Sequence, residues 1–400
     1  RRAHELWLTS SVQCRRISSS RQKFGHVSDD MTTPQADRED GEVMSAATGQ
    51  SAAHHGLPDR FGRLATDLRV SVTDHCNLRC TYCMPAEGMD WLANRDLLTD
   101  DEIIRVIGIG IERLGITKVR FTGGEPLLRP SLENLVAATS TLRRTNGTPP
   151  ITALTTNGIG LDRRVDGLVE AGLDRVNISL DTVDRERFAT ISRRDRLADV
   201  VTGIDAALAA RLLVKINAVP QIDSYRRDIP ELLVFCLDRG LELRFIEFMP
   251  IGANGWKREA TVSADDILTV VRDAGFSITA DQAARGSSPA QRWSVSSRHT
   301  RPGWLGIIAS VTRPFCANCS RTRLTADGQI RNCLFADQEA DLRSCYAQEP
   351  AMTRSSPYGK VKCGAKAPTT GLTTGVLPTP GVACLPLEGE YASALLRRHS

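Results

Sequence analysis

The stretch "TDHCNLRCTYCMP", Thr73–Pro85, places three cysteines, Cys76, Cys80 and Cys83, within eight residues. A structural zinc site usually needs four ligands, commonly from two CxxC pairs or from CxxC with two histidines. His75 is a poor fourth ligand because it neighbours Cys76 on a turning backbone. Three thiolates suit a 4Fe-4S cluster in which one iron has no protein ligand and is open to a small molecule. The spacing therefore predicts a reactive iron–sulfur cluster.

A repeating pattern of strand and helix extends outward from this stretch. Six β-branched or apolar runs between Leu68 and Pro250 are separated by amphipathic segments. The clearest segment predicts a helix that follows Thr99, with Glu102 completing a capping box, and stops at Gly115. Similar segments predict crossover helices and a parallel sheet. The six predicted strands are residues 67–73, 118–122, 151–156, 175–181, 212–219 and 241–249.

Polar residues gather at the C-terminal ends of these predicted strands. Active sites of parallel α/β proteins are built at that edge of the sheet. The distribution favours α/β architecture in the form of a partial (βα)6 barrel over a doubly wound sheet. The polar residues are His75, Cys76, residues 122–125 and 155–157, Ser179, Asp181, Asn217, Glu247 and Met249.

A second cysteine group appears late in the chain, in "FCANCSRTRLTADGQIRNC". Cys316, Cys319 and Cys333 follow a CxxC-x13-C spacing. Three ligands again suggest an open iron–sulfur cluster, although a zinc site completed by a distant residue is an alternative. Within the group, Arg321 and Arg323 flank Thr322. An isolated RxR is usually a solvated charge run.

The position of this RxR between the cysteines favours a different interpretation. Paired guanidinium groups are suited to bind phosphate with two hydrogen bonds each. Arg69, Arg120 and Lys215 lie in or near predicted strands, where a cation otherwise has little reason to be. These cations together predict a site for a polyphosphate.

The composition limits the remaining classes of function. The 400 residues carry a net charge of +4, so no general nucleic-acid or membrane surface is expected. No apolar run approaches the roughly 20 residues of a transmembrane helix, and no secretory signal is recognisable. Eleven cysteines in a soluble, reducing compartment indicate metal ligands or buried side chains rather than disulfides.

Composition also divides the chain into four predicted segments. Residues 1–60 are read as a disordered leader, 61–250 as the barrel, 251–343 as an α+β extension with the second cluster, and 344–400 as an atypical disordered tail. An internal start at Met31 or Met44 gives a cytoplasmic protein. A genuine basic leader would instead give a mitochondrial matrix protein.

The cysteine motif, with Tyr82 before its last cysteine and "GGEP" at residues 123–126, resembles the signature of radical S-adenosylmethionine enzymes. "TTNG", "NISLD", "VKIN", "RFIEFMP" and the second cysteine group follow in order. From about Phe61 to Arg343 this set resembles the GTP 3′,8-cyclase family, whose members are lyases of molybdenum cofactor biosynthesis.

The resemblance implies two 4Fe-4S clusters, one held by Cys76, Cys80 and Cys83 and the other by Cys316, Cys319 and Cys333. It implies that S-adenosylmethionine yields a radical that removes the ribose C3′ hydrogen of GTP. The carbon radical left at C3′ then attacks guanine C8. It also implies an electron donor, cyclic pyranopterin monophosphate synthase downstream, and a possible homodimer. From the resemblance, contacts to S-adenosylmethionine are expected at Tyr82, Gly124, Ser179 and Met249. Contacts to GTP are expected at Arg69, Arg120, Thr155, Lys215, Arg321, Thr322 and Arg323. Arg321 and Arg323 are also expected to be catalytic.

Three other interpretations belong to different classes. One is another radical enzyme with an auxiliary cluster, and another is a zinc protein without activity. The third is an impaired cyclase, because family members continue past the segment matching 341–343 and end in Gly-Gly. Here the sequence continues "SCYAQEPAMTRSS" and ends "LLRRHS". That departure predicts binding of both clusters with poor turnover of GTP.

Overall fold

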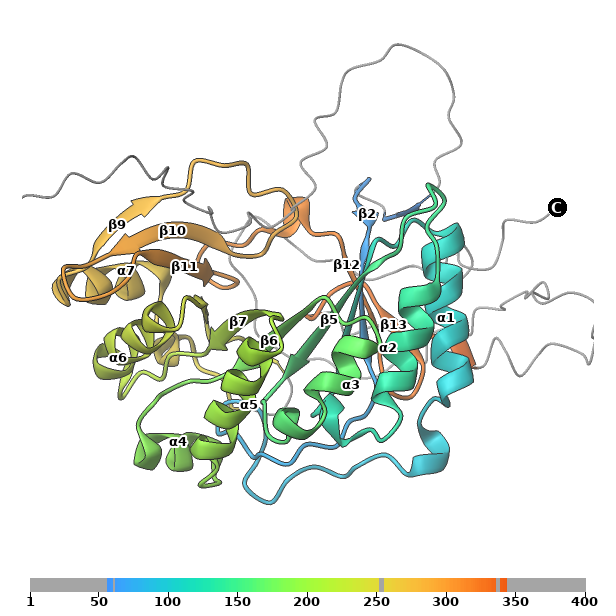
Figure 1. Ribbon diagram of the computed structural model, residues 1–400, viewed down its shortest axis with the longest axis horizontal. Helices are drawn as coiled ribbons and strands as arrows, with labels where there is room; N and C mark the ends of the chain where they lie inside the picture. Colours follow the sequence, from blue (N-terminus) through green and yellow to red (C-terminus); the bar gives the residue numbers. More distant parts are fainter. Residues whose placement is uncertain (1–55, 60–61, 252–254, 336–338, 344–400) are drawn as a thin grey trace, which may run out of the picture. The chain divides into compact units, whose positions relative to one another are not determined.

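One twelve-stranded sheet organises the part of the chain that can be described (Figure 1). The structure, a computed structural model, describes residues 56–59, 62–251, 255–335 and 339–343. The predicted leader up to residue 55 and the predicted tail from residue 344 lie outside these residues. The part described therefore covers both cysteine groups and all of the predicted barrel apart from residue 61.

Eight neighbouring strands of this sheet run parallel, in the order β12-β3-β4-β5-β6-β7-β8-β11. Antiparallel strands extend the two edges, β13 and β14 beside β12, and β10 and β9 beside β11. The bounds are β3 Asp67–Ser71, β4 Lys118–Thr122, β5 Ile151–Thr156, β6 Arg175–Ser179, β7 Leu213–Ala218, β8 Glu242–Ile246, β9 Ser277–Ala280, β10 Gln291–Ser296, β11 Gly303–Ile308, β12 Arg321–Leu324, β13 Gln329–Arg331 and β14 Ala340–Asp341.

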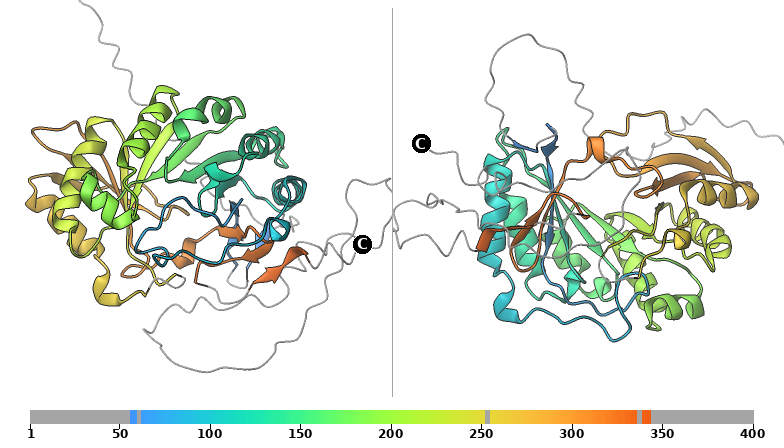
Figure 2. Two further views of the ribbon diagram at one scale, coloured as in Figure 1. Left: turned by 90° about the horizontal axis from the view of Figure 1, so that it is seen from below. Right: turned by 180° about the vertical axis from the view of Figure 1, so that it is seen from behind.

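The helices cover the outer, convex face of the curved sheet (Figure 2). In the first of them, the side chain of Thr99 accepts a hydrogen bond from the Glu102 amide and Glu102 accepts one from the Thr99 amide, so the predicted capping box is confirmed. The helices are α1 Asp100–Arg113, α2 Leu132–Thr141, α3 Val165–Glu170, α4 Arg185–Ser192, α5 Leu197–Ala209, α6 Tyr225–Asp238 and α7 Ala264–Asp273. None of the helices described is long and apolar enough to span a membrane.

The six predicted strands are present as β3 to β8, and the partial barrel is confirmed. The predicted strand 241–249 is shorter in the structure, Glu242–Ile246. The buried carboxylate of Glu247 accepts hydrogen bonds from the amides of Ala264, Val311 and Thr312. These bonds tie the end of β8 to α7 and to the segment that leads to the second cysteine group.

The region after Pro250 joins the barrel sheet at both edges. Its strand β11 pairs with β8, and its strand β12 returns across the molecule to pair with β3. Both additions satisfy backbone groups that would otherwise be left on open edges. The sheet is thus continuous across the predicted boundary at residue 250.

A short hairpin precedes the barrel. Strand β1, Leu57–Pro58, pairs with β2, Leu64–Ala65, and the buried Leu57 packs with Ala65 and Leu114. The last residues of the predicted leader therefore belong to the folded unit, because this apolar contact anchors them beside α1.

The contribution of the core between helices and sheet to stability can be tested at Ile107, which is fully buried in α1. Ile107→Ala removes most of a packed side chain and should lower the free energy of unfolding by roughly 2–5 kcal/mol. Arg113→Ala, at the exposed end of the same helix, should change it by no more than about 0.5 kcal/mol. Urea denaturation of both variants measures the difference, and equal stabilities would contradict this description of the core.

Candidate active site

A cavity of about 350 Å³ lies on the inner face of the sheet. Its volume is within the usual range of small-molecule sites. Residues from the cysteine stretches at both ends of the chain contribute to its wall, together with inward-facing side chains of β3 to β8. The predicted site residues that line it are Arg69, Tyr82, Arg120, Thr155, Ser179, Met249, Cys316, Cys319, Arg321, Arg323 and Cys333.

Three arginines form a row across neighbouring strands of this wall. Arg323 in β12 pairs in register with Arg69 in β3, and Arg69 pairs with Arg120 in β4. Like charges at neighbouring positions repel one another. Asp67 stands in register with Arg321 and supplies one opposing charge to this group. A site with this balance favours an anionic ligand.

The row of arginines is electrostatically costly in the absence of a ligand. Burial, followed by the neighbouring charge of Arg69, lowers the pKa of both Arg120 and Arg323 to about 9. Because these values lie well below the ordinary value for arginine, the charged groups destabilise the fold at every pH below about 9, and the cost is relieved only as the pH rises above it.

Unsatisfied hydrogen-bond donors accompany this charge. Arg120 Nη1 donates to Thr155 Oγ1 at 3.3 Å. The buried Nε atoms of Arg69 and Arg120 have no hydrogen-bond partner. A buried donor without a partner is costly, and phosphate oxygens would satisfy such donors with charge-assisted bonds.

Two predicted phosphate contacts lie away from the cavity wall. Thr322 alternates with its arginine neighbours along β12, so its side chain faces the other side of the sheet, beside Leu68 and Val106. Lys215 is buried in β7, where its Nζ lies 3.2 Å from Glu242 Oε2. Glu242 also accepts a hydrogen bond from Arg244, at 2.6 Å.

Another part of the cavity contains the residues predicted to bind S-adenosylmethionine. Tyr82, Ser179 and Met249 all line it. The Tyr82 hydroxyl donates to Asp181 Oδ2 at 2.8 Å, and Asp181 Oδ1 accepts from the Val219 amide at 2.8 Å. Burial raises the pKa of Asp181 to about 6. This carboxylate therefore connects the first cysteine stretch to the ends of β6 and β7.

Gly124 allows the backbone after β4 to lie directly against the backbone of residues 73–75. Its amide donates to the Thr73 carbonyl at 2.8 Å. A Cβ atom at this position would lie 2.1 Å from the His75 carbonyl oxygen, which no side chain could accommodate. The Gly-Gly pair is required here because the end of β4 packs directly against the backbone that enters the first cysteine stretch.

The first cysteine loop, defined here as residues 74–85, is a compact turn. The amides of Cys83 and Met84 both donate to the Cys80 carbonyl. Its three thiols are free, and burial raises the pKa of Cys76, Cys80 and Cys83 above the ordinary value. These sulfurs are therefore neutral thiols until an electrophilic metal takes the place of the proton.

The second cysteine group faces the cavity directly. Cys316 begins a short 3-10 turn, Cys316–Asn318, and Cys319 follows it. Arg321 Nε donates to Cys319 Sγ at 3.3 Å. Arg63, which precedes the barrel, donates to the Cys316 carbonyl at 2.5 Å. The thiols and the row of arginines thus share one wall.

The donors fit the implied iron–sulfur clusters. Among the described residues, no three His, Cys, Asp or Glu side chains are placed to share a single metal ion. A cuboidal cluster does not need such a group because each thiolate binds a different iron. None of these six cysteines forms a disulfide, and the three of the second group line the cavity.

The structure adds cavity residues that the motifs did not identify. Arg63, Asn177 and Arg244 line the cavity, as does the ring of Phe315, which lies against the guanidinium groups of Arg285 and Arg321. An arginine inside the apolar strand "LELRFIEFM" was a usable signal for Arg244. Arg63 had none, because its role depends on a contact with a residue 253 positions away.

Two family models match adjoining segments of this chain. A family model described as the Radical SAM superfamily matches residues 70–236, and one described as Molybdenum Cofactor Synthesis C matches residues 241–355. A crystal structure of Streptococcus suis SuiB bound to S-adenosylmethionine aligns with 70% of this chain and 63% of its own, at 17% identity and a TM-score of 0.49.

Curated relatives match more closely. A GTP 3′,8-cyclase of Corynebacterium glutamicum is 51% identical over 325 residues, which are 78% of this chain and 86% of the relative. A GTP 3′,8-cyclase 2 of Mycobacterium bovis is 55% identical over 290 residues, which are 72% of this chain and 79% of the relative. With identity at this level over most of both chains, the protein belongs to the GTP 3′,8-cyclase family.

Proposed function

We propose that this protein is a radical S-adenosylmethionine lyase that cyclises GTP to 3′,8-cyclo-7,8-dihydro-GTP, the first step of molybdenum cofactor biosynthesis. The observation that carries the proposal is the row formed by Arg323, Arg69 and Arg120, which lies in the same cavity wall as the second cysteine group. A buried row of cations beside a metal-ligand set is suited to a small polyanion. Family membership supports GTP as that polyanion.

The arginine row would bind the triphosphate. The unpartnered Nε atoms of Arg69 and Arg120 supply donors inside a site shielded from water, where charge-assisted hydrogen bonds are strongest. Thr155 already holds Arg120 in place. Thr322 would contribute by its position between Arg321 and Arg323 rather than through its side chain. Lys215 stays a prediction as a GTP contact.

The cosubstrate would occupy the part of the cavity lined by Tyr82, Ser179 and Met249. The hydrogen bond between Tyr82 and Asp181 fixes the aromatic ring of this loop residue at the end of β6. Gly124 allows its backbone and that of the same loop to lie in contact. These residues would orient S-adenosylmethionine between the loop and the substrate, so that the reacting groups are held together.

The two cysteine groups would hold the metal centres, with Cys76, Cys80 and Cys83 at one and Cys316, Cys319 and Cys333 at the other. When bound, the clusters supply one electron and open iron sites for the two small molecules. Family membership supports the first cluster, and the second is supported by three cysteines that line the cavity and form no disulfide. The electron donor, cyclic pyranopterin monophosphate synthase and a homodimer stay predictions.

Anaerobic reconstitution tests the proposal. The wild-type chain should bind about eight iron and eight sulfide, two four-iron clusters. Replacing either cysteine group by serine should halve that content. With dithionite, S-adenosylmethionine and GTP, the wild type should form 5′-deoxyadenosine and the cyclic nucleotide in matched amounts. Zinc without iron, or 5′-deoxyadenosine without any cyclic nucleotide, would contradict the proposed function.

Arg323→Ala separates binding of the two small molecules. Loss of charge-assisted hydrogen bonds should weaken GTP binding by about 10- to 100-fold and leave cleavage of S-adenosylmethionine largely intact. Arg313→Ala is the matched control, because Arg313 is an exposed arginine paired with Asp265 outside the cavity. Isothermal titration with GTP makes the measurement, and unchanged affinity in Arg323→Ala would remove this residue from the site.

Arg120→Met should have opposite effects on the free and the bound protein. Removing a buried charge whose pKa is lowered should raise the melting temperature of the nucleotide-free protein. It should also abolish most of the stabilisation that GTP gives the wild type. Thermal unfolding with and without GTP measures both effects. A lower melting temperature without nucleotide, with the GTP effect retained, would show that Arg120 is structural.

A further inference from the structure

The end of helix α4 contacts the first cysteine loop through its backbone. The Ile191 carbonyl accepts a hydrogen bond from the Thr81 amide at 2.9 Å, and the Ser192 carbonyl accepts one from the Arg79 amide at 3.0 Å. The last carbonyls of a helix have no partner within the helix. Here they are satisfied by the loop that carries the cysteines.

The next residue, Arg193, continues this contact with its side chain. Its Nη1 donates to the carbonyl oxygens of Arg79, at 3.0 Å, and Met84, at 2.9 Å. These two carbonyls lie on either side of the segment from Cys80 to Cys83. One guanidinium group therefore bridges the two ends of the turn that presents two of the three thiols.

The backbone of Arg193 is unusual. It has a φ of 54° and a ψ of 26°, in the left-handed region at the end of α4. A residue with a Cβ atom is disfavoured there, and glycine is the usual choice. Such conformations persist where the surroundings determine them and often mark functional positions. The two hydrogen bonds of the side chain give a reason for arginine.

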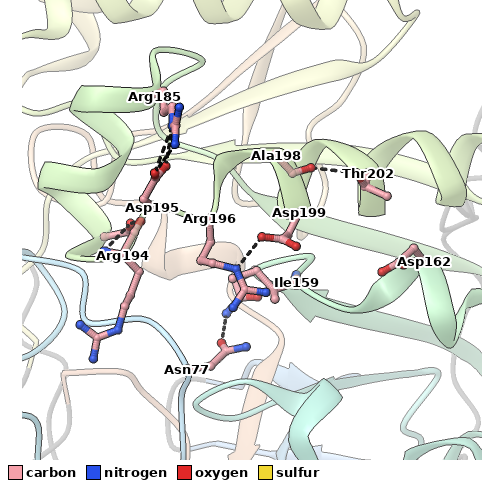
Figure 3. Close-up of polar contacts among 12 residues, drawn as sticks. Asn77, Ile159, Asp162, Arg185, Arg194, Asp195, Arg196, Ala198, Asp199 and Thr202 are labelled. Atoms are coloured by element: carbon pink, nitrogen blue, oxygen red, sulfur yellow. Dashed lines mark hydrogen bonds and ion pairs between the residues drawn. The ribbon is translucent and has the colours of Figure 1, made fainter.

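The connection between α4 and α5 is itself well fixed. Arg185 binds both carboxylate oxygens of Asp195, with distances from 2.6 to 3.0 Å. The Ser192 hydroxyl donates to the Arg194 carbonyl at 2.8 Å. Figure 3 shows Arg185 and Asp195 pointing toward one another, and Arg196 beside Asn77 of the cysteine loop. Arg193 thus lies between this hydrogen-bonded connection and the loop.

We propose that Arg193 is a positioning residue for the first iron–sulfur cluster, because its guanidinium clamps both ends of the Cys80–Cys83 turn to the end of α4. The proposal rests on the proposed function for the identity of the cluster. The arginine touches neither a thiol nor the cavity. It acts by keeping the turn in the shape that presents the sulfurs, so the cluster is retained.

Arg193→Gly is the informative variant. Glycine accepts the left-handed backbone without strain, so the fold should be kept while the clamp is lost. Arg211→Gly is the matched control. Arg211 is the other described non-glycine residue with a positive φ, at 59°, and it is an exposed residue after α5. Arg193→Lys, which keeps the charge and one set of donors, should rescue part of the effect.

Hydrogen exchange of the cluster-free protein is the first measurement. Peptides that contain Arg79 and Thr81 should exchange about tenfold faster in Arg193→Gly than in the wild type, since two hydrogen bonds that hold the loop are lost. Arg211→Gly should not change them. Unchanged exchange in Arg193→Gly would overturn the proposal.

Iron retention is the second measurement, made in full-length backgrounds that keep one cysteine group each. Where Cys76, Cys80 and Cys83 remain and the second group is serine, Arg193→Gly should speed loss of iron to a chelator by about tenfold. In the background where only Cys316, Cys319 and Cys333 remain, Arg193→Gly should not change the rate of iron loss. Equal acceleration in both backgrounds would mean general destabilisation and overturn the proposal. A first group that binds no iron would contradict the proposed function instead, and hydrogen exchange would then decide the role of Arg193 alone.

Discussion

The pairing of β12 with β3 is the contact on which the rest of the site depends. Four residues near the end of the described chain lie in register with four at the start of the barrel, so that Arg323 meets Arg69. This pairing completes the row that continues to Arg120, and it brings the second cysteine group over the inner face of the sheet. If β12 were absent, the cavity would lose one wall and β3 would be an open edge.

The same pairing explains why the site is costly without its ligand. Three guanidinium groups in neighbouring strands are buried with lowered pKa values, so their charges lower the stability of the fold. Functional sites often trade stability in this way. The opposing contribution comes from the core behind the sheet, where Ile103, Ile107 and Phe121 are fully buried.

Local patterns predicted much of this structure. The capping box of Thr99, the six strands and both cysteine groups follow from spacing within a few residues of the chain. The sequence motifs could not reveal that Lys215 meets Glu242, because the two lie in separate strands whose register depends on the whole sheet. The side of the sheet faced by Thr322 depends in the same way on how β12 is placed. Contacts by Arg63 and Arg193 were missed because their partners are backbone carbonyls, which carry no signal in sequence.

The contact between Arg63 and Cys316 joins residues 253 positions apart. Because the ribosome makes the chain from its N-terminus, the first cysteine group is synthesised well before the second. The first loop emerges early, followed by the helices and strands that hold it, and domains generally begin folding from the N-terminal side. The second group can take its place in the cavity wall only after β12 has been synthesised and has paired with β3. The long separation of the two cysteine groups in the sequence thus sets the order in which their surroundings can fold.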